Sequence, residues 1–228
     1  MTRSAAPSAR TRVRRVPARA DYDRATIDAI LDEALVAHLG FAVDGQPYVI
    51  PTLHARAGDV VYVHGSAASR LVRTLTDPAH PTPACLTVTL LDGLVLARSA
   101  FHHSMNYRSV VVLGQARLVE GDAERRAALR AFTERLVPGR WDEVRPPNRQ
   151  ELKATQVLAL TLDEASAKLR RGGPVDDEDD HALDVWAGVL PLALERGAPE
   201  PDARLRPGIA PSAAVSEWAA TGERRAAA

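Results

Sequence analysis

A loop rich in small polar residues joins an apolar strand to the start of a helix, and its chemistry suits phosphate binding. Residues 60–70 read Val-Val-Tyr-Val-His-Gly-Ser-Ala-Ala-Ser-Arg. Gly65 permits an unusual backbone turn. Ser66 and Ser69 offer hydroxyls, and Arg70 offers a planar fork for phosphate oxygens. Because a helix start carries partial positive charge, the pattern predicts an anion site. A capped helix with a surface arginine is the alternative interpretation.

A polar sheet face is predicted beside this loop. Antiparallel counting around a hairpin centred near Gly58 places His54 opposite Tyr62 and Thr52 opposite His64. These four side chains would then share one face of the sheet. Such a face fits the wall of a cofactor site, and it also fits the solvent side of an amphipathic hairpin.

A second polar segment stands at the entry of a buried strand. Residues 106–109 read Asn-Tyr-Arg-Ser and are followed directly by Val-Val-Val-Leu. A planar heterocycle with carbonyls and ring nitrogens needs donors and acceptors of this kind at its edge. The alternative is that Tyr107 packs in the core and that Arg108 pairs with an acidic residue.

Other chemistry is not indicated. The seven histidines include no pair with helical metal-ligand spacing, so no metal site is predicted. The acidic run at 176–180 is typical of a solvated loop. The chain has no glycine-rich dinucleotide fingerprint, no P-loop and no Gly-x-Ser-x-Gly elbow.

Composition sets the class of protein. The 228 residues are 46% hydrophobic and 25% charged, with a formal net charge of zero, which fits one globular domain with tails and argues against a dedicated nucleic-acid binder. Cys85 is the single cysteine, so no internal disulfide is possible and a reducing cytoplasm is expected. No apolar run approaches the roughly 20 residues that span a bilayer, so we expect no membrane role.

Periodicity predicts an α+β fold made mostly of short antiparallel strands. A helix is expected from an Asp23 cap to just before Gly40, and further helices from Asp122 to Leu136 and over 148–154. Asp92-Gly93 is the strongest hairpin signal in the chain. The expected strands are 41–44, 48–56, 60–64, 84–91, 94–99, 107–120 and, as the last, 156–162. About six strands joined this way favour a closed barrel.

The two ends of the chain differ in composition from the middle. Residues 1–20 contain six arginines and no acidic residue, and they predict a disordered basic arm. Residues 195–228 predict a mostly disordered tail with one weak helix near 213–221. The folded domain is therefore expected to span 21–194.

The order of these motifs resembles a known family. His-Gly-Ser-x-x-Ser-Arg at 64–70 is followed by Asp92-Gly93 and then by Asn-Tyr-Arg-Ser-Val-Val-Val from residue 106. This order is similar to the FMN-binding split-barrel proteins related to pyridoxamine-phosphate oxidase, and more closely to their nitroimidazole-reductase-like branch. Lys168 and the segment that begins at Trp186 extend the resemblance over about residues 22–192. True pyridoxamine-phosphate oxidases usually carry lysine where this chain has Leu71, which puts vitamin B6 oxidation in doubt.

The resemblance implies an antiparallel split β-barrel with flanking helices, assembled as a homodimer with FMN at the subunit interface. Ser69 and Arg70 would hold the phosphate, and His64 is the candidate catalytic residue, as a proton donor beside the ring. The cofactor-binding residues that the resemblance implies are Val49, Pro51, Thr52, His64, Gly65, Ser66, Ser69, Arg70, Asn106, Tyr107, Arg108, Ser109, Lys168 and Trp186.

The implied activity is that of a small flavin oxidoreductase. It would accept electrons from a reduced nicotinamide, directly or through a partner, and pass them to a small acceptor such as a nitroaromatic or a quinone. Two alternatives remain open from the sequence. One is a deazaflavin-dependent reductase on the same fold, and the other is a non-enzymatic module that binds flavin or haem.

Overall fold

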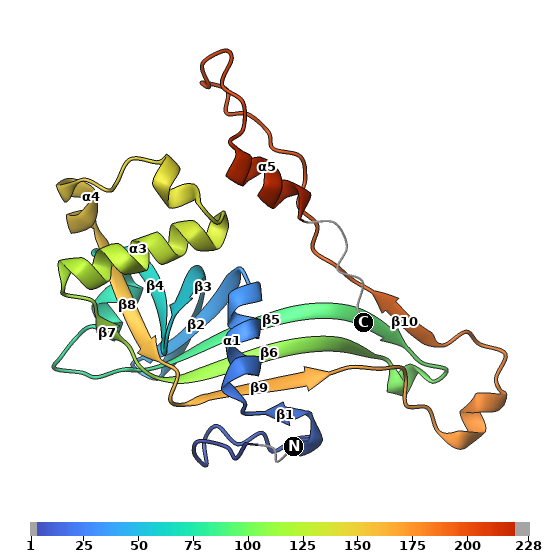
Figure 1. Ribbon diagram of the computed structural model, residues 1–228. Helices are drawn as coiled ribbons and strands as arrows, with labels where there is room; N and C mark the ends of the chain where they lie inside the picture. Colours follow the sequence, from blue (N-terminus) through green and yellow to red (C-terminus); the bar gives the residue numbers. More distant parts are fainter. Residues whose placement is uncertain (1–3, 222–228) are drawn as a thin grey trace.

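The computed structural model describes residues 4–221 and shows a largely antiparallel sheet with helices against its two faces (Figure 1). This confirms the predicted α+β split-barrel class. The strands follow the order β1-β9-β6-β5-β2-β3-β4-β8-β7, and β10 pairs with β5. The strand bounds are β1 Ala20–Asp21, β2 Val36–Val43, β3 Gln46–Ala57, β4 Val60–Ser66, β5 Pro83–Leu96, β6 Ser104–Gln115, β7 Arg117–Leu118, β8 Thr155–Thr161, β9 Ala165–Arg170 and β10 Gly188–Pro191.

The helices divide between the two faces of the sheet. In Figure 1, α1 lies across β5, β6 and β9, whereas α3 and α4 cover the end of the sheet formed by β4 and β8. The helix bounds are α1 Arg24–Glu33, α2 Arg70–Leu75, α3 Asp122–Leu136, α4 Arg149–Ala154 and α5 Ala213–Ala220, with short 3-10 helices η1 Pro17–Arg19, η2 Ala100–His102, η3 Arg140–Glu143 and η4 Glu178–Ala182. No helix within residues 4–221 has both the length and the apolar character needed to cross a membrane.

Helix α1 begins where the sequence predicts and ends earlier. The Asp23 carboxylate caps it by accepting from the Ala25 N–H, and the helix ends at Glu33. The expected continuation toward Gly40 is wrong, because Val36–Val43 forms β2. This strand buries alternate residues and hydrogen-bonds to β3 on one edge and β5 on the other. Pairing with β3 over its whole length and with β5 over residues 37–40 stabilises this segment as a strand in spite of its helical spacing.

The hairpin between β3 and β4 has a register one residue away from the predicted one. Ala57 pairs with Val60, so the loop holds only Gly58 and Asp59, and Gly58 has a positive φ of 56°. His54 consequently faces Val63 rather than Tyr62. A shift of one residue reverses the faces. The predicted polar face therefore does not exist.

Asp92 and Gly93 form no turn. Strand β5 runs straight through them, and its pairing with β6 shifts register between Leu91 and Gly93, which marks a bulge. Gly93 is needed for close approach, because a Cβ there would stand 3.0 Å from the backbone oxygen of Leu190 on β10. The hairpin predicted at this dipeptide is therefore wrong, and only the strand pairing reveals the bulge.

The second half of the chain matches the sequence more closely. Helix α3 begins at Asp122 as predicted, α4 has Asn148 as its cap in a capping box, and α5 falls within the helix expected near 213–221. The long strand expected over 107–120 is divided into β6 and β7. Strand β8 is not the last, since β9 follows and lies between β1 and β6.

Two apolar clusters hold the domain together. The main core lies between α1 and the inner face of the sheet and includes the fully buried Ile30, Leu31, Leu39, Leu86 and Val110. A smaller cluster packs α3 on the opposite face of β3, β4 and β8. Because α3 covers only this end of the outer face, the rest of that face has no covering element within the described residues.

Both ends of the described chain contact the domain. Ser8 and Arg10 bind the Glu164 carboxylate, and β1 pairs with β9. The C-terminal segment runs away from the sheet in Figure 1, and Ser212 donates a hydrogen bond to Glu143. The expected boundaries at 21 and 194 and the expected disorder of the ends stay predictions. Residues 1–3 and 222–228 of those ends lie outside the described part of the chain.

Candidate cofactor site

The loop at the end of β4 leads into Arg70, an exposed arginine at the start of α2. The Ser69 hydroxyl accepts from the Val72 N–H and caps α2, while the Ser66 hydroxyl accepts from the Ala68 N–H. Each hydroxyl keeps its own hydrogen as a donor. Arg70 is exposed, and its guanidinium lies over the Tyr48 ring at 4.6 Å from the centroid. None of the ion pairs within residues 4–221 involves Arg70.

An exposed apolar strip follows the outer face of β3, the strand that also carries Tyr48. Val49 is 65% exposed and Pro51 is also exposed, and both point to the outer face of the sheet. Leu53 continues the strip toward His64. Thr52 lies on the inner face instead, since it pairs with the buried Ala37, and its hydroxyl donates to the Leu53 carbonyl. A flat apolar ring system could therefore lie on the outer face of β3, but without direct contact from Thr52.

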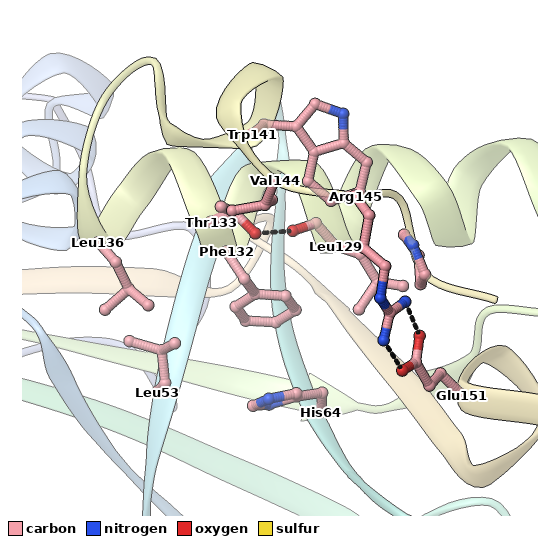
Figure 2. A pocket seen from close by; sticks show the side chains of 11 residues that line it. Leu53, His64, Leu129, Phe132, Thr133, Leu136, Trp141, Val144, Arg145 and Glu151 are labelled. Carbon is pink, nitrogen blue, oxygen red and sulfur yellow. Dashed lines mark hydrogen bonds and ion pairs between the residues drawn. The ribbon is translucent and has the colours of Figure 1, made fainter. Parts of the chain in front are cut away.

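A pocket of about 460 Å³ opens between α3 and the end of this strip (Figure 2). The volume falls within the range of roughly 300–1,000 Å³ for small-molecule sites. Most of its lining is apolar, and its charged residues form one ion pair. The lining residues are Leu53, His64, Leu129, Phe132, Thr133, Leu136, Trp141, Val144, Arg145, Pro147 and Glu151.

His64 lies at one side of this pocket beneath Phe132. The two rings stack with centroids 4.7 Å apart and an angle of 26° between their planes. The His64 Nδ1 atom is buried and has no hydrogen-bond partner within the described residues. Burial lowers the pKa of His64 below its usual 6.5, so the ring is neutral at neutral pH.

The charged pair stands apart from the aromatic part of the pocket. Arg145 donates two hydrogen bonds to the Glu151 carboxylate, at 2.9 and 2.5 Å, and both side chains reach solvent. The Arg145 guanidinium, with the N–H of Asn148, lowers the pKa of Glu151 to about 2. The site thus combines an apolar interior, one neutral imidazole and a zwitterionic pair at its edge.

The second predicted segment is occupied by structural contacts. Arg108 holds the carboxylates of Asp92 and Glu33, whose hydrogen bonds raise the arginine pKa further. Its ion-pairing interpretation is therefore the one that the structure supports. Asn106 is buried, donates to the Gly172 carbonyl at 3.1 Å and accepts from Arg170 at 2.5 Å.

The remaining predicted residues lie near this segment. Ser109 donates to the backbone oxygen of Lys168, which is on the neighbouring strand β9. Tyr107 is half-buried and pairs with Arg170, so it is not a core residue. Trp186 is 67% exposed in the segment before β10. Within one chain, β5, β2 and β3 lie between β6 and β4, so the two predicted groups do not meet on the sheet.

The sequence reasoning missed the walls of the pocket. Leu129, Phe132 and Leu136 lie on one face of α3 at helical spacing, a signal that was available but indicated only core packing. Trp141 lies in the short helix η3, Val144 and Arg145 lie in the irregular segment before α4, and Glu151 lies in α4. No hydrophobic periodicity marks the stretch from Trp141 to Arg145 as a wall of a pocket.

One group of side chains could hold a metal ion within the described chain. His102, Asp177 and Asp180 place ligand atoms within 4.8 Å of one another on two exposed turns. His102 already interacts with Asp177 at 3.3 Å. The absence of a metal site stays a prediction.

Comparison with known proteins identifies the family. Residues 23–169 match the family model described as pyridoxamine 5'-phosphate oxidase. The chain therefore belongs to the pyridoxamine 5'-phosphate oxidase family, as the motif order predicted. No curated protein matches the chain.

Two similar solved structures cover most of the chain. The flavocytochrome Anf3 from Azotobacter vinelandii is 44% identical, with a TM-score of 0.87, over 94% of this chain and 98% of that one. An FAD and haem binding protein from Mycobacterium smegmatis is 37% identical, with a TM-score of 0.82, over 86% and 95%.

A third solved structure shares the fold. It is a Bacteroides thetaiotaomicron protein proposed to act in 5-nitroimidazole antibiotic resistance. It is 21% identical with a TM-score of 0.55, over 65% of this chain and 85% of that one. At this identity the likeness concerns the fold alone.

Proposed function

We propose that this protein is a flavin-binding oxidoreductase whose flavin ring lies on the outer face of β3 and whose phosphate binds at Ser69 and Arg70. The observation that carries the proposal is the exposed Arg70, which forms no ion pair within residues 4–221 and lies over the ring of Tyr48, the chain neighbour of Val49 in the exposed apolar strip. A charged fork next to an apolar platform suits a ligand that is flat and apolar at one end and anionic at the other.

The residues present fit such a ligand. The guanidinium of Arg70 would donate two N–H hydrogen bonds to phosphate oxygens, and the Ser66 and Ser69 hydroxyls can still donate hydrogen bonds. The role of proton donor expected for His64 would require its neutral, partly buried ring to take up a proton first, so we assign it no proton transfer in this proposal. The flavin, when bound, supplies the electron-transfer chemistry, whereas the protein binds, orients and excludes water.

The flavin that we propose is FAD, with FMN, the expectation from sequence, as the alternative. The Mycobacterium smegmatis protein, 37% identical, is described as binding FAD. Both cofactors carry a phosphate next to the ribityl chain, so the role of Arg70 is the same for either. Small acceptors such as nitroaromatics or quinones and a reduced nicotinamide donor complete the proposed reaction, in a cytoplasmic protein.

A second copy of the chain would complete the site. Along the hydrogen-bonded sheet, β5, β2 and β3 separate β6 from β4, so we propose that the segment 106–109, Lys168 and Trp186 contact the flavin of a second copy of the chain. The uncovered outer sheet face, with Val36, Val49 and Leu91 exposed, offers the apolar surface that such a dimer needs. Sedimentation of flavin-loaded protein tests this, and a flavin-bound monomer would refute it.

Titration with flavins tests the central proposal. FAD, FMN, riboflavin and a deazaflavin are added to wild type, to Arg70→Ala and to Arg73→Ala. Arg73 is the matched control, because it is exposed on the same helix and none of the ion pairs among residues 4–221 involves it.

The expected result separates the phosphate from the ring. A charge-assisted hydrogen bond contributes about 1.5–3 kcal/mol, so Arg70→Ala should weaken FAD and FMN binding by roughly ten- to a hundredfold. Riboflavin binding should change little, and Arg73→Ala should behave as wild type. Equal weakening for all ligands would place the phosphate elsewhere, and absence of saturable flavin binding would refute the function.

A second proposed function is haem binding. The two relatives that are 44% and 37% identical to this chain are described as a flavocytochrome and as an FAD and haem binding protein. The haem-binding alternative left open by the sequence thus combines with the flavin function. Reconstitution with hemin, followed by its absorption spectrum, tests it; a spectrum identical to free hemin at every protein concentration would exclude it.

A further inference from the structure

The α3 pocket has the chemistry of a site for a large, flat, apolar ligand. Its interior is made of leucine, phenylalanine, tryptophan, valine and proline side chains. The charged pair Arg145–Glu151 is at the edge of the pocket and reaches solvent (Figure 2). A ligand with its apolar part inside the pocket would have its carboxylates at this edge. Arg145 is the cation of this lining, and a second carboxylate could replace Glu151 on its planar fork.

His64 lines this pocket and has a ring nitrogen that could bind a metal ion. Neither ring nitrogen has a hydrogen-bond partner within residues 4–221, and Nδ1 is buried, so Nε2 is the nitrogen left to the pocket. A neutral imidazole nitrogen is the form that binds iron in haem proteins. The ring is held by stacking on Phe132, in place of the usual hydrogen bond to the second nitrogen.

Most other histidines are unsuited to this role. His54 is buried and bonded to the Leu31 carbonyl, and His80 and His102 interact with aspartates at the surface. His103 binds the Ser99 carbonyl. His38 is exposed on the outer face of β2 and is the main competitor, whereas His181 lies in the exposed η4.

We propose that the α3 pocket binds haem and that His64 Nε2 is an axial ligand of the haem iron. The proposal rests on the second proposed function, haem binding, and adds its place and its ligand. Phe132 would then be a positioning residue, because its ring stacks on the His64 imidazole. No hydrogen bond to Nδ1 from residues 4–221 fixes the orientation of that imidazole. The uncovered strip of β3 begins at Leu53, so haem here would border the proposed flavin.

The test is hemin titration of the full-length protein, followed by Soret absorption and by electron paramagnetic resonance of the ferric form. The variants are His64→Ala, His64→Gly with and without added imidazole, and His38→Ala as the matched control. We expect saturable binding by wild type and His38→Ala. His64→Ala should bind hemin at least ten- to a hundredfold more weakly, the range seen when support of a metal ligand is lost.

A second variant covers the case in which the His64 variants fail to fold. Leu136 lines the pocket and is half-exposed, so Leu136→Trp should fill the pocket from its solvent side without enlarging the core. It should block hemin while its circular dichroism stays that of wild type. Restoration of the wild-type spectrum of His64→Gly by imidazole would further support ligation.

The outcomes separate the two proposals. If wild type does not bind hemin, haem binding fails and the assignment fails with it. If wild type binds hemin and His64→Ala keeps the same affinity and spectrum, haem binding survives and the assignment to His64 is overturned. Loss of binding in His38→Ala alone would move the ligand to the outer face of β2.

Discussion

His54 makes the stability of this protein depend on pH in a defined direction. Its side chain is 0% exposed in the main core, and its Nε2 donates to the Leu31 carbonyl at 2.9 Å. Leu31 is near the end of α1, where carbonyls lack an intrahelical partner. The His54 Nδ1 atom is buried and has no hydrogen-bond partner among residues 4–221, so the neutral ring is the form that this site accommodates.

Burial, with a smaller contribution from the charge of Arg135, lowers the pKa of His54 below its ordinary 6.5. The unfolded chain therefore binds a proton at this residue below about pH 6.5, while the folded chain does not. Stability from this residue is complete above that pH and is lost as the pH falls toward the folded pKa. A difference of one bound proton between the folded and unfolded chain changes the free energy of unfolding by at most about 1.36 kcal/mol per pH unit.

The perturbation is His54→Gln, whose amide can still donate to the Leu31 carbonyl but does not titrate. Free energies of unfolding are measured by urea denaturation from pH 8 to pH 5 for wild type and variant. At pH 8 the variant should be less stable by roughly 1–3 kcal/mol, from imperfect packing and hydrogen-bond geometry. Below pH 6.5 that difference should shrink, with a slope approaching about 1.36 kcal/mol per unit.

The difference between the two curves isolates His54, because the lowered pKa of His64 contributes equally to both proteins. A wild-type-minus-variant difference that stays constant from pH 8 to pH 5 would refute the reasoning, since it would mean that His54 takes up its proton equally well folded and unfolded.

Three further substitutions test the packing around the site. Phe132→Ala should lower the free energy of unfolding by about 3–5 kcal/mol, because it removes a buried ring that stacks on His64; a loss below 1 kcal/mol in urea denaturation would show that α3 is not docked as described. Gly93→Ala should cost roughly 1–3 kcal/mol by forcing β10 away, whereas Gly114→Ala, with open space at its Cβ, should cost much less, and equal costs would contradict the close approach. Arg108→Met should cost about 1–2 kcal/mol by removing the guanidinium that bridges the Asp92 and Glu33 carboxylates, and a cost unaffected by salt would argue against the ion-pair network.

The sequence alone determined the family and the elements with strong local signals. Helix α4 lies within the predicted 148–154 segment, and α3 begins at the predicted Asp122, because capping and helical spacing act over a few neighbouring residues. The loop at 64–70 likewise lies between a strand and a helix as predicted. Local chemistry also gave both interpretations of Arg108, an ion pair or a ligand contact, without deciding between them.

Tertiary structure decided which face each side chain occupies and where it meets others. The two-residue loop at Gly58 shifted β3 against β4 by one position, and this moved His54 into the core and left His64 under α3. Strand pairing also made Asp92-Gly93 a bulge rather than a turn. The α3 pocket arose in the same way, because its walls come from segments far apart in sequence. Local propensity is set by neighbours along the chain, whereas register and pockets are set by long-range burial and hydrogen bonding, which no short segment encodes by itself.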